Sequence, residues 1–264
     1  MSAPSVAPAR ERRAAPRPDP KVLARRVAVA RAAGRRRLRR AGVAAAVVAL
    51  GVLALVVLHS PLCSVRTVTI VGARHTTRAE VLAATGLRAH PPLIDVSSAR
   101  AEAALEALPW VARARVTKRW PSAVSIVLRE RVAVAAAPIP GGRVALLDPS
   151  GRVLEDVARA SGVVPLAGLA RVPRPGGFVE APGASLAAVA AEVPASLVGR
   201  IAYLAERRGL GVVCRIVHGP LAVLGTAADL HEKFVALATV LARVDVTGIV
   251  TIDLRVPSRA VLTP

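Results

Sequence analysis

The feature that most constrains this chain is an uncharged run of eighteen residues from Ala41 to Leu58, AGVAAAVVALGVLALVVL. As an α-helix the run is about 27 Å long at 1.5 Å per residue, close to the roughly 30 Å hydrocarbon core of a bilayer. A core helix of a soluble domain rarely lacks a polar position over so many turns, because one side of it usually faces water. We therefore predict a transmembrane helix over residues 41–59. Neither end of the run carries the Trp or Tyr that commonly anchors a span at the interface.

Basic residues precede the apolar run. The first forty residues hold thirteen Lys and Arg against two acidic residues, more than half of the net charge of +20. Because Lys and Arg are retained on the cytoplasmic side, the amino terminus is expected in the cytoplasm and residues 59–264 outside it. The membrane-orienting residues are Arg35, Arg36, Arg37, Arg39 and Arg40. The expected protein is a single-pass type II protein of the cell (inner) membrane, which contacts lipid through residues 41–59 and their basic flank.

Two processing signals compete with this interpretation. A cleaved signal peptide has a short basic region, whereas forty residues precede the apolar run here. A lipoprotein signal is suggested by Cys63, but Ser60, Pro61 and Leu62 before it do not form the small-residue pattern that such processing needs. We expect the helix to be retained.

Residues 1–40 are predicted to be a disordered basic cytoplasmic tail. Up to Pro20 they are rich in proline and lack aromatic residues, so they cannot bury enough apolar surface to offset chain entropy. A short basic helix over residues 21–40 is the exception. Contact with nucleic acid would be limited to phosphates, because no aromatic residue interleaves with the arginines for base stacking. Anionic lipid is the favoured counterion, and nucleic acid is not the expected partner.

Residues 62–132 have the pattern of a small α+β domain with the order β-α-α-β-β. A β-branched run ends at Gly72, and Thr77 with Glu80 forms a capping box for a helix that ends near Gly86. A second helix starts at Ser97 or Ser98 and is closed by Pro109. Two strands with alternating apolar residues follow, over residues 112–117 and 124–128, the first with a basic outer face.

Residues 133–257 are predicted to be a mostly antiparallel β domain with one packed helix. Turn signals predict hairpin strands at 144–147 and 152–154, and residues 165–183 are rich in Pro and Gly and predict a loop. A helical signal over residues 187–204 is interrupted by Pro194, and strands are expected at 212–217 and 221–224. The helix lies over 227–241, with an apolar stripe that packs on the sheet. A final strand covers 249–254, and residues 258–264 are a C-terminal tail.

Several stretches resemble the FtsQ/DivIB family of bacterial cell-division proteins. The matching stretches are Val68-x-Ile70-x-Gly72, Pro109-Trp110-Val111, Arg119-Trp120-Pro121, Arg129-Glu130-Arg131, Val134-Ala135, Asp148, Gly151, Val153, Leu224-Gly225, Lys233 and Ile252-Asp253-Leu254-Arg255. The resemblance covers about residues 41–260 and implies a POTRA domain for the β-α-α-β-β module. It also implies a non-enzymatic scaffold that links early and late division proteins at the division septum.

The resemblance implies that the last strand binds FtsB, which comes with FtsL. A terminal strand offers unpaired backbone groups to which a partner strand can add. The candidate partner-binding residues are Thr251, Ile252, Asp253, Leu254, Arg255, Val256 and Ser258. Alternation places Asp253 and Arg255 on one face, where Arg255 is either a hot spot that pairs with a partner carboxylate or a solvated arginine. The family often has an aromatic residue where this chain has Val256.

Catalytic signatures are missing from the sequence. His231-Glu232 lacks a second His four residues later, and Gly209-x-Gly211 precedes a strand instead of following one. No Ser-x-x-Lys and no Gly-x-Ser-x-Gly is present. We expect no enzyme activity, no metal and no cofactor. Cys63 and Cys214 are interpreted as two separate thiols, with a disulfide as the alternative, and Trp110 and Trp120 as core residues at least as well as binding residues.

Two other functions are kept as alternatives. One is a POTRA-containing membrane protein of a secretion or outer-envelope assembly system, although no barrel-length series of strands follows the module. The other is a membrane protein that binds nucleic acid through its basic tail.

Overall fold

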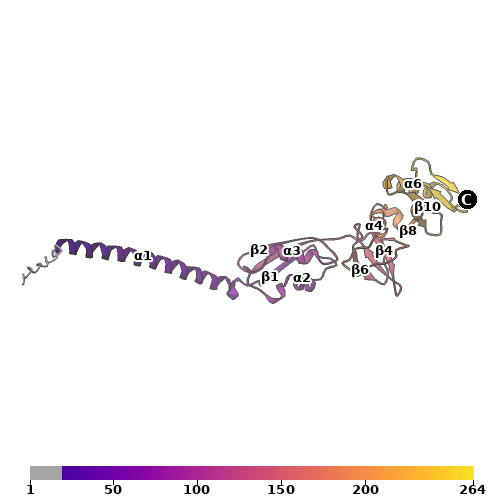
Figure 1. Cartoon of the computed structure of the whole chain (residues 1–264). Helices are drawn as coiled ribbons and strands as arrows, with labels where there is room; N and C mark the ends of the chain where they lie inside the picture. The colour runs from indigo at the N-terminus through magenta and orange to yellow at the C-terminus, as the bar shows by residue number, and fades with distance from the viewer. Residues whose placement is uncertain (1–19) are drawn as a thin grey trace, which may run out of the picture. The chain divides into compact units, whose positions relative to one another are not determined.

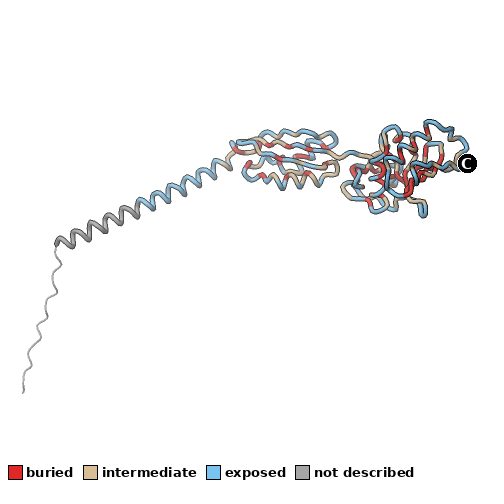
Figure 2. Tube along the Cα trace, turned by 90° about the horizontal axis from the view of Figure 1, so that it is seen from above, coloured by how far each residue is buried: buried red, intermediate tan, exposed pale blue. Residues whose placement is uncertain are grey.

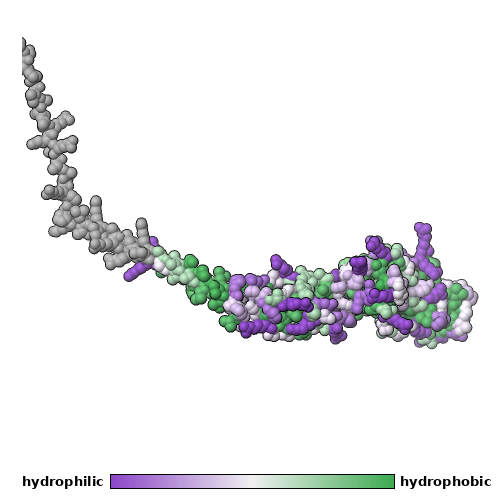
Figure 3. All heavy atoms as spheres, turned by 90° about the horizontal axis from the view of Figure 1, so that it is seen from below, coloured by the Kyte–Doolittle hydropathy of each residue, from purple (hydrophilic) through white to green (hydrophobic). Residues whose placement is uncertain are grey.

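The computed structural model describes residues 20–264, with side chains described from Arg39 onward, and it forms two units, up to His59 and from Ser60 (Figure 1). The first unit contains α1 (Pro20–Leu58), so the basic and apolar segments form one helix instead of two. Residues 1–19 of the predicted tail lie outside the described residues. The segment Arg39–Leu58 has a mean hydropathy of 2.8 and none of it is buried, so it meets the requirements of a membrane span. Figure 2 shows this segment exposed up to its last residue, Leu58, which is of intermediate burial, and Figure 3 shows its apolar surface.

The second unit begins with a three-stranded sheet covered by two helices, which confirms the predicted element order. After the turn η1 (Pro61–Cys63), the elements are β1 (Thr67–Val71), α2 (Arg78–Thr85), η2 (Leu87–Ala89), α3 (Ser98–Glu106), β2 (Val111–Arg119) and β3 (Ala123–Glu130). The strand order is β1-β3-β2, with β1 parallel and β2 antiparallel to β3. The edge strands of this three-stranded sheet are therefore β1 and β2.

Local capping sets the start of both helices. The Thr77 hydroxyl accepts a hydrogen bond from the Glu80 N–H, and the Glu80 carboxylate accepts one from the Thr77 N–H at 2.7 Å. This reciprocal pair satisfies two donors that a helix start leaves open. At α3 the Ser97 hydroxyl alone provides the cap, by accepting from the Arg100 N–H.

The inner face of the sheet packs against these helices. Val124 and Ile126 of β3 are buried against Val81 of α2 and Leu105 of α3. Gly72, at the end of β1, has a φ of +88°, and a Cβ there would lie 2.0 Å from the Leu128 carbonyl oxygen. Glycine is therefore required where β1 closes onto β3.

Residues from 133 onward form two further sheets. The first has the order β6-β5-β4-β7, from β4 (Ala135–Ile139), β5 (Arg143–Leu147), β6 (Val153–Val157) and β7 (Val164–Pro165). The second has the order β12-β11-β10-β9-β8, from β8 (Ile201–Arg207), β9 (Gly211–Ile216), β10 (Leu221–Gly225), β11 (Thr251–Asp253) and β12 (Val261–Thr263). A parallel bridge between Leu166 and Leu204 joins the two sheets, so β7 continues next to β8.

Three short helices complete this region: α4 (Gly183–Ala191), α5 (Ala195–Val198) and α6 (Leu230–Arg243). The predicted stripe of α6 is confirmed, because Phe234 and Leu237 are fully buried in the core formed with the sheets. The helical interpretation of residues 187–204 is wrong at its end. Residues from Ile201 form β8, because antiparallel pairing with β9 buries Ile201 and Leu204 better than an exposed helix could.

Candidate functional site

The predicted partner-binding residues lie at and after β11, but β11 is not an edge strand. It pairs in parallel with β10 and antiparallel with β12. The chain turns after β11, with a hydrogen bond from Arg259 N–H to the Val256 carbonyl, and the Val250 N–H donates to the Thr263 carbonyl at 2.9 Å. The prediction that the strand over residues 249–254 is the last strand and the sheet edge is therefore wrong, because residues 261–263 of the expected tail return and pair with it.

The alternation of side chains along β11 is as predicted. Ile252 and Leu254 are fully buried in the core of the two joined sheets. Asp253 and Arg255 point away from that core, and Arg255 has a side-chain exposure of 58%. Val256 and Ser258 follow in the exposed turn between β11 and β12, whereas Thr251 is half-buried.

Arg255 is already engaged within the chain. Its Nε lies 3.1 Å and 3.0 Å from Oδ1 and Oδ2 of Asp253, and its Nη2 also donates to Oδ2. Hydrogen bonds from Arg255 lower the pKa of Asp253 below its ordinary value. A carboxylate of a partner must therefore share or displace Asp253, using the part of the guanidinium that remains exposed.

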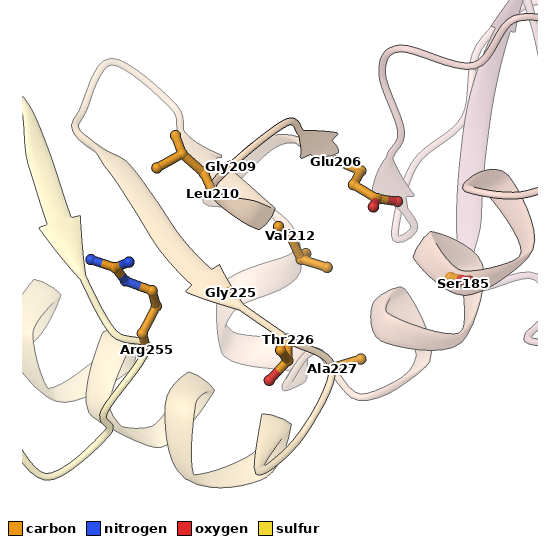
Figure 4. Close-up of a pocket in the computed structure, with 10 residues that line it drawn as sticks. Ser185, Glu206, Gly209, Leu210, Val212, Gly225, Thr226, Ala227 and Arg255 are labelled. Carbon is orange, nitrogen blue, oxygen red and sulfur yellow. The ribbon is translucent and has the colours of Figure 1, made fainter.

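Arg255 also lines a pocket of about 490 Å³ beside the end of β10 (Figure 4). Glu206 contributes a carboxylate from β8, so the pocket carries both signs of charge. A Cβ on Gly225 would lie 2.8 Å from Cγ of Arg255, and one on Gly211 would lie 2.4 Å from the Gly225 carbonyl oxygen. The two glycines thus let β9, β10 and the Arg255 side chain approach one another.

β12 is the outermost strand of this sheet. Within the described chain, no strand lies beyond it and no side chain hydrogen-bonds to it. Val261, at its start, is 58% exposed. Sequence reasoning missed this strand, and its only signal was a short apolar run, Ala260-Val261-Leu262, after Pro257.

A second cluster forms where β3 leads into the β domain, and it gathers residues that carry the family resemblance. Both oxygens of Glu130 are occupied: its Oε1 accepts from the N–H groups of Arg74, His75 and Thr76 at 2.9 to 3.0 Å. Burial alone would raise the pKa of Glu130, but the hydrogen bonds from Thr76, Arg74 and His75 outweigh it and lower the pKa to about 2. The His75 ring stacks on Trp110 at 3.9 Å between centroids.

Asp148 organises the same junction from the other side. Arg131 donates to its Oδ2 at 2.7 Å, and Oδ1 accepts from the N–H groups of Ser150 and Arg152. Burial opposes ionisation, but these hydrogen bonds hold the pKa of Asp148 below its ordinary value. The Arg152 guanidinium donates to the Ala107 carbonyl at 2.8 Å, just after α3. The bonds from Ser150 and Arg152 to Asp148 are local, whereas the Arg131–Asp148 and Arg152–Ala107 contacts join residues 17 and 45 positions apart, which local sequence patterns did not indicate.

Neither cysteine forms a disulfide. Cys63 and Cys214 are free and buried, and burial raises the pKa of the Cys214 thiol to about 12. Among residues 39–264, no group of three or more His, Cys, Asp and Glu side chains is arranged to hold a metal ion. Trp120 is 54% exposed, so the core interpretation of this residue is wrong.

Comparisons with known proteins show similarity to cell-division proteins in part of the chain. Residues 63–131 match the model of the POTRA domain, FtsQ-type. The cell division protein FtsQ of Mycobacterium leprae is 30% identical over 182 residues, 69% of this chain and 52% of that protein. FtsQ of Mycolicibacterium smegmatis is 28% identical over 190 residues, 72% of this chain and 55% of that protein. The chain thus matches about half the length of these relatives.

A solved structure, the major extracytoplasmic domain of the trans isomer of the cell division protein DivIB from Geobacillus stearothermophilus, is 22% identical with a TM-score of 0.31. The match covers 44% of this chain and 98% of the DivIB chain. A structural similarity this low carries no argument about this chain. The domain match over residues 63–131 and the two curated relatives are the similarities that count. These matches support a similarity of this chain to the FtsQ/DivIB family of cell-division proteins.

Proposed function

We propose that this chain is a non-enzymatic scaffold of the division machinery, anchored in the membrane by α1. It links early and late division proteins at the septum by binding FtsB- and FtsL-type proteins through its extracytoplasmic domains. The observation that carries the proposal is the unpaired outer side of β12, because backbone groups at such an edge accept a further strand.

The proposed topology rests on the distribution of charge along α1. Arg35, Arg36, Arg37, Arg39 and Arg40 precede the apolar segment, and no Lys or Arg lies within it. Because the side rich in Lys and Arg stays in the cytoplasm, the POTRA domain and the β domain are extracytoplasmic.

The partner surface proposed here combines β12 with the turn before it. Exposed Val256 and Val261 provide apolar contacts beside the backbone edge, and exposed Arg255 provides charge. A partner strand with an acidic residue near its apolar contacts would satisfy all three features. Ile252 and Leu254 support the surface from the core and do not contact the partner.

The experiment is a pull-down of the FtsB- and FtsL-type proteins from membranes that contain single variants of this chain. Val261→Lys and Arg255→Ala should each reduce recovery of the partner. Val235→Lys is the matched control, since Val235 is 48% exposed on α6 of the same domain. Full recovery by both test variants would remove the β12 edge from the proposal. Ile252 is unsuitable for this test, because truncating a fully buried side chain costs about 2 to 5 kcal/mol of stability.

A further inference from the structure

The POTRA domain has one end at which the chain emerging from α1 meets the hairpin between β2 and β3. β1 starts at Thr67 opposite Ala123, and Ala123 lies opposite Arg119. The Arg66 N–H donates to the Ser122 carbonyl at 2.8 Å. We call the residues 60–67, 90–94 and 118–122 the proximal end.

Residues 90–94 of the proximal end are hydrogen-bonded to the segment that precedes β1. The Val65 N–H donates to the Pro91 carbonyl, and the Leu93 N–H donates to the Cys63 carbonyl at 2.8 Å. The proximal end is therefore a rigid part of the domain and not a loose linker.

Apolar and basic side chains share the surface of this end. Leu62 is 67% exposed, Trp120 is 54% exposed and Ile94 is 36% exposed. Arg66 and Arg119 are exposed beside them, and Lys118 donates to the Ile94 carbonyl. Asp95 is the nearest acidic residue in sequence and follows directly on this segment.

The length of the connecting chain limits the distance between this surface and the end of α1. Leu62 stands four residues after Leu58, where the helix ends. Eight residues, 59–66, lie between Leu58 and the start of β1 at Thr67. At about 3.3 to 3.6 Å per residue, a fully extended chain from Leu58 to Thr67 would span about 30 to 32 Å. The turn η1 shortens this distance.

We propose that the proximal end is a second membrane contact, in which Trp120 lies at the headgroup level of the outer bilayer surface. Tryptophan favours this depth, because its ring is apolar and its indole N–H is polar. Arg66, Lys118 and Arg119 bind lipid phosphates around it. Trp120 thereby supplies, from the folded domain, the interfacial aromatic residue that is missing beside the apolar run of α1.

A bilayer is the occupant that the observations favour. Once α1 spans the membrane, the connecting chain keeps this surface within roughly 30 Å of the end of the span, and the charge of the surface complements phosphate groups. The proposal rests on α1 spanning the membrane and does not depend on binding of FtsB- or FtsL-type proteins.

The test uses the full chain in vesicles of phosphatidylcholine, with or without phosphatidylglycerol, in which part of the lipid carries bromine near the headgroup. Brominated lipid quenches tryptophan within contact distance, and this chain has only two tryptophans. Wild-type fluorescence should be quenched, and Trp120→Phe should lose the quenched component and keep that of Trp110. Vesicle flotation checks insertion, and circular dichroism checks the fold.

A charge variant sharpens the test. Arg119→Glu should reduce quenching, most strongly in vesicles with phosphatidylglycerol. Arg129→Glu is the matched control, because Arg129 is exposed in the same sheet at the end of β3 opposite to the hairpin. Equal quenching in wild type and Trp120→Phe, with the chain inserted, would overturn the proposal and favour a protein partner at this surface. If the wild type does not float with the vesicles, α1 does not span the membrane and the proposed lipid contact is overturned. The pull-down would still report on partner binding.

Discussion

Edge strand β2 of the POTRA domain and edge strand β12 of the β domain differ in their outer backbone groups. Side chains bond to those of β2, whereas those of β12 are unpaired within the described chain. Two side chains of α3 occupy the outer side of β2: the Glu102 carboxylate accepts from the Val116 N–H at 2.8 Å, and that of Glu106 from the Ala114 N–H at 3.2 Å. No described side chain does this at β12. An edge whose amides are already bonded cannot add a strand, so the difference indicates which of these two edges is available to a partner.

The carboxylates on α3 arise from a helical repeat. Glu102 and Glu106 are four residues apart and therefore project from the same side of α3. Arg113 and Arg115 lie exposed on β2 beside them, and Glu106 comes within 4.0 Å of Arg113. The POTRA edge is thus closed by polar groups, whereas the surface at β12 combines exposed Val256 and Val261 with Arg255.

The largest expected effect comes from disrupting the POTRA sheet itself. Gly72→Ala places a Cβ against the Leu128 carbonyl oxygen in a backbone conformation that L residues avoid, so we expect a loss of about 3 to 4 kcal/mol in the free energy of unfolding. Gly86→Ala is the control, with φ +71° and nothing within 4 Å, and should lose about 1 kcal/mol. Urea unfolding measures both. Equal losses would show that the close approach of β1 to β3 is not limiting.

The next effect is the pH dependence of stability that Glu130 causes. The pKa of Glu130 is about 2 in the folded chain against an ordinary value of 4.5. Its stabilising contribution is therefore complete above about pH 4.5 and is lost as pH falls toward 2, by at most about 3 kcal/mol. Thermal unfolding between pH 2 and 6 measures this loss, which Glu130→Gln should largely remove. Glu155→Gln, an exposed carboxylate, should leave the pH profile unchanged.

Opening the closed edge directly tests the comparison. Glu102→Ala with Glu106→Ala leaves two backbone donors of β2 without their acceptors and should cost about 1 to 2 kcal/mol. Self-association should rise, measured by sedimentation velocity of the full chain in detergent. The double Gln variant keeps an oxygen acceptor at each position and should behave like the wild type. If the Ala variant does not associate more than the Gln variant, these carboxylates are not what closes the edge.

The smallest effect concerns the open edge. Asp253→Asn weakens the ion pair that engages Arg255 and should strengthen partner binding by about threefold to tenfold, because the guanidinium becomes available to a partner carboxylate. Titration of the partner against both chains gives the ratio. The same substitution in an Arg255→Ala background should have no effect. Weaker binding by Asp253→Asn alone would show that the pair, and not Arg255 alone, is recognised.

Local signals were sufficient for most of the POTRA domain. The capping box of Thr77 and Glu80, the cap at Ser97 and the alternation around Val124 and Ile126 each concern residues within a few positions of one another. Such signals can be read without knowing the fold. The same holds for the amphipathic stripe of α6, which Phe234 and Leu237 bury as expected.

Strand pairing decided the features that the sequence did not predict. β8 was interpreted as helix, because Ala, Leu and Val in this region suit either structure until β9 pairs with it. β12 has three residues and exists through its pairing with β11. Predicted binding residues were therefore assigned to an edge that a later segment covers.

The membrane span, its basic flank and the β-α-α-β-β order followed from the sequence alone, because hydropathy, charge and helix caps act between neighbours along the chain. Tertiary structure decided which sheet edge is open, that Glu130 binds three backbone amides, and that Trp120 is exposed in the hairpin whose Ser122 carbonyl accepts from the Arg66 N–H. The Glu130 contacts and the Arg66–Ser122 contact join residues more than fifty positions apart, and the free energy of burying or pairing such residues is determined only when the sheets assemble.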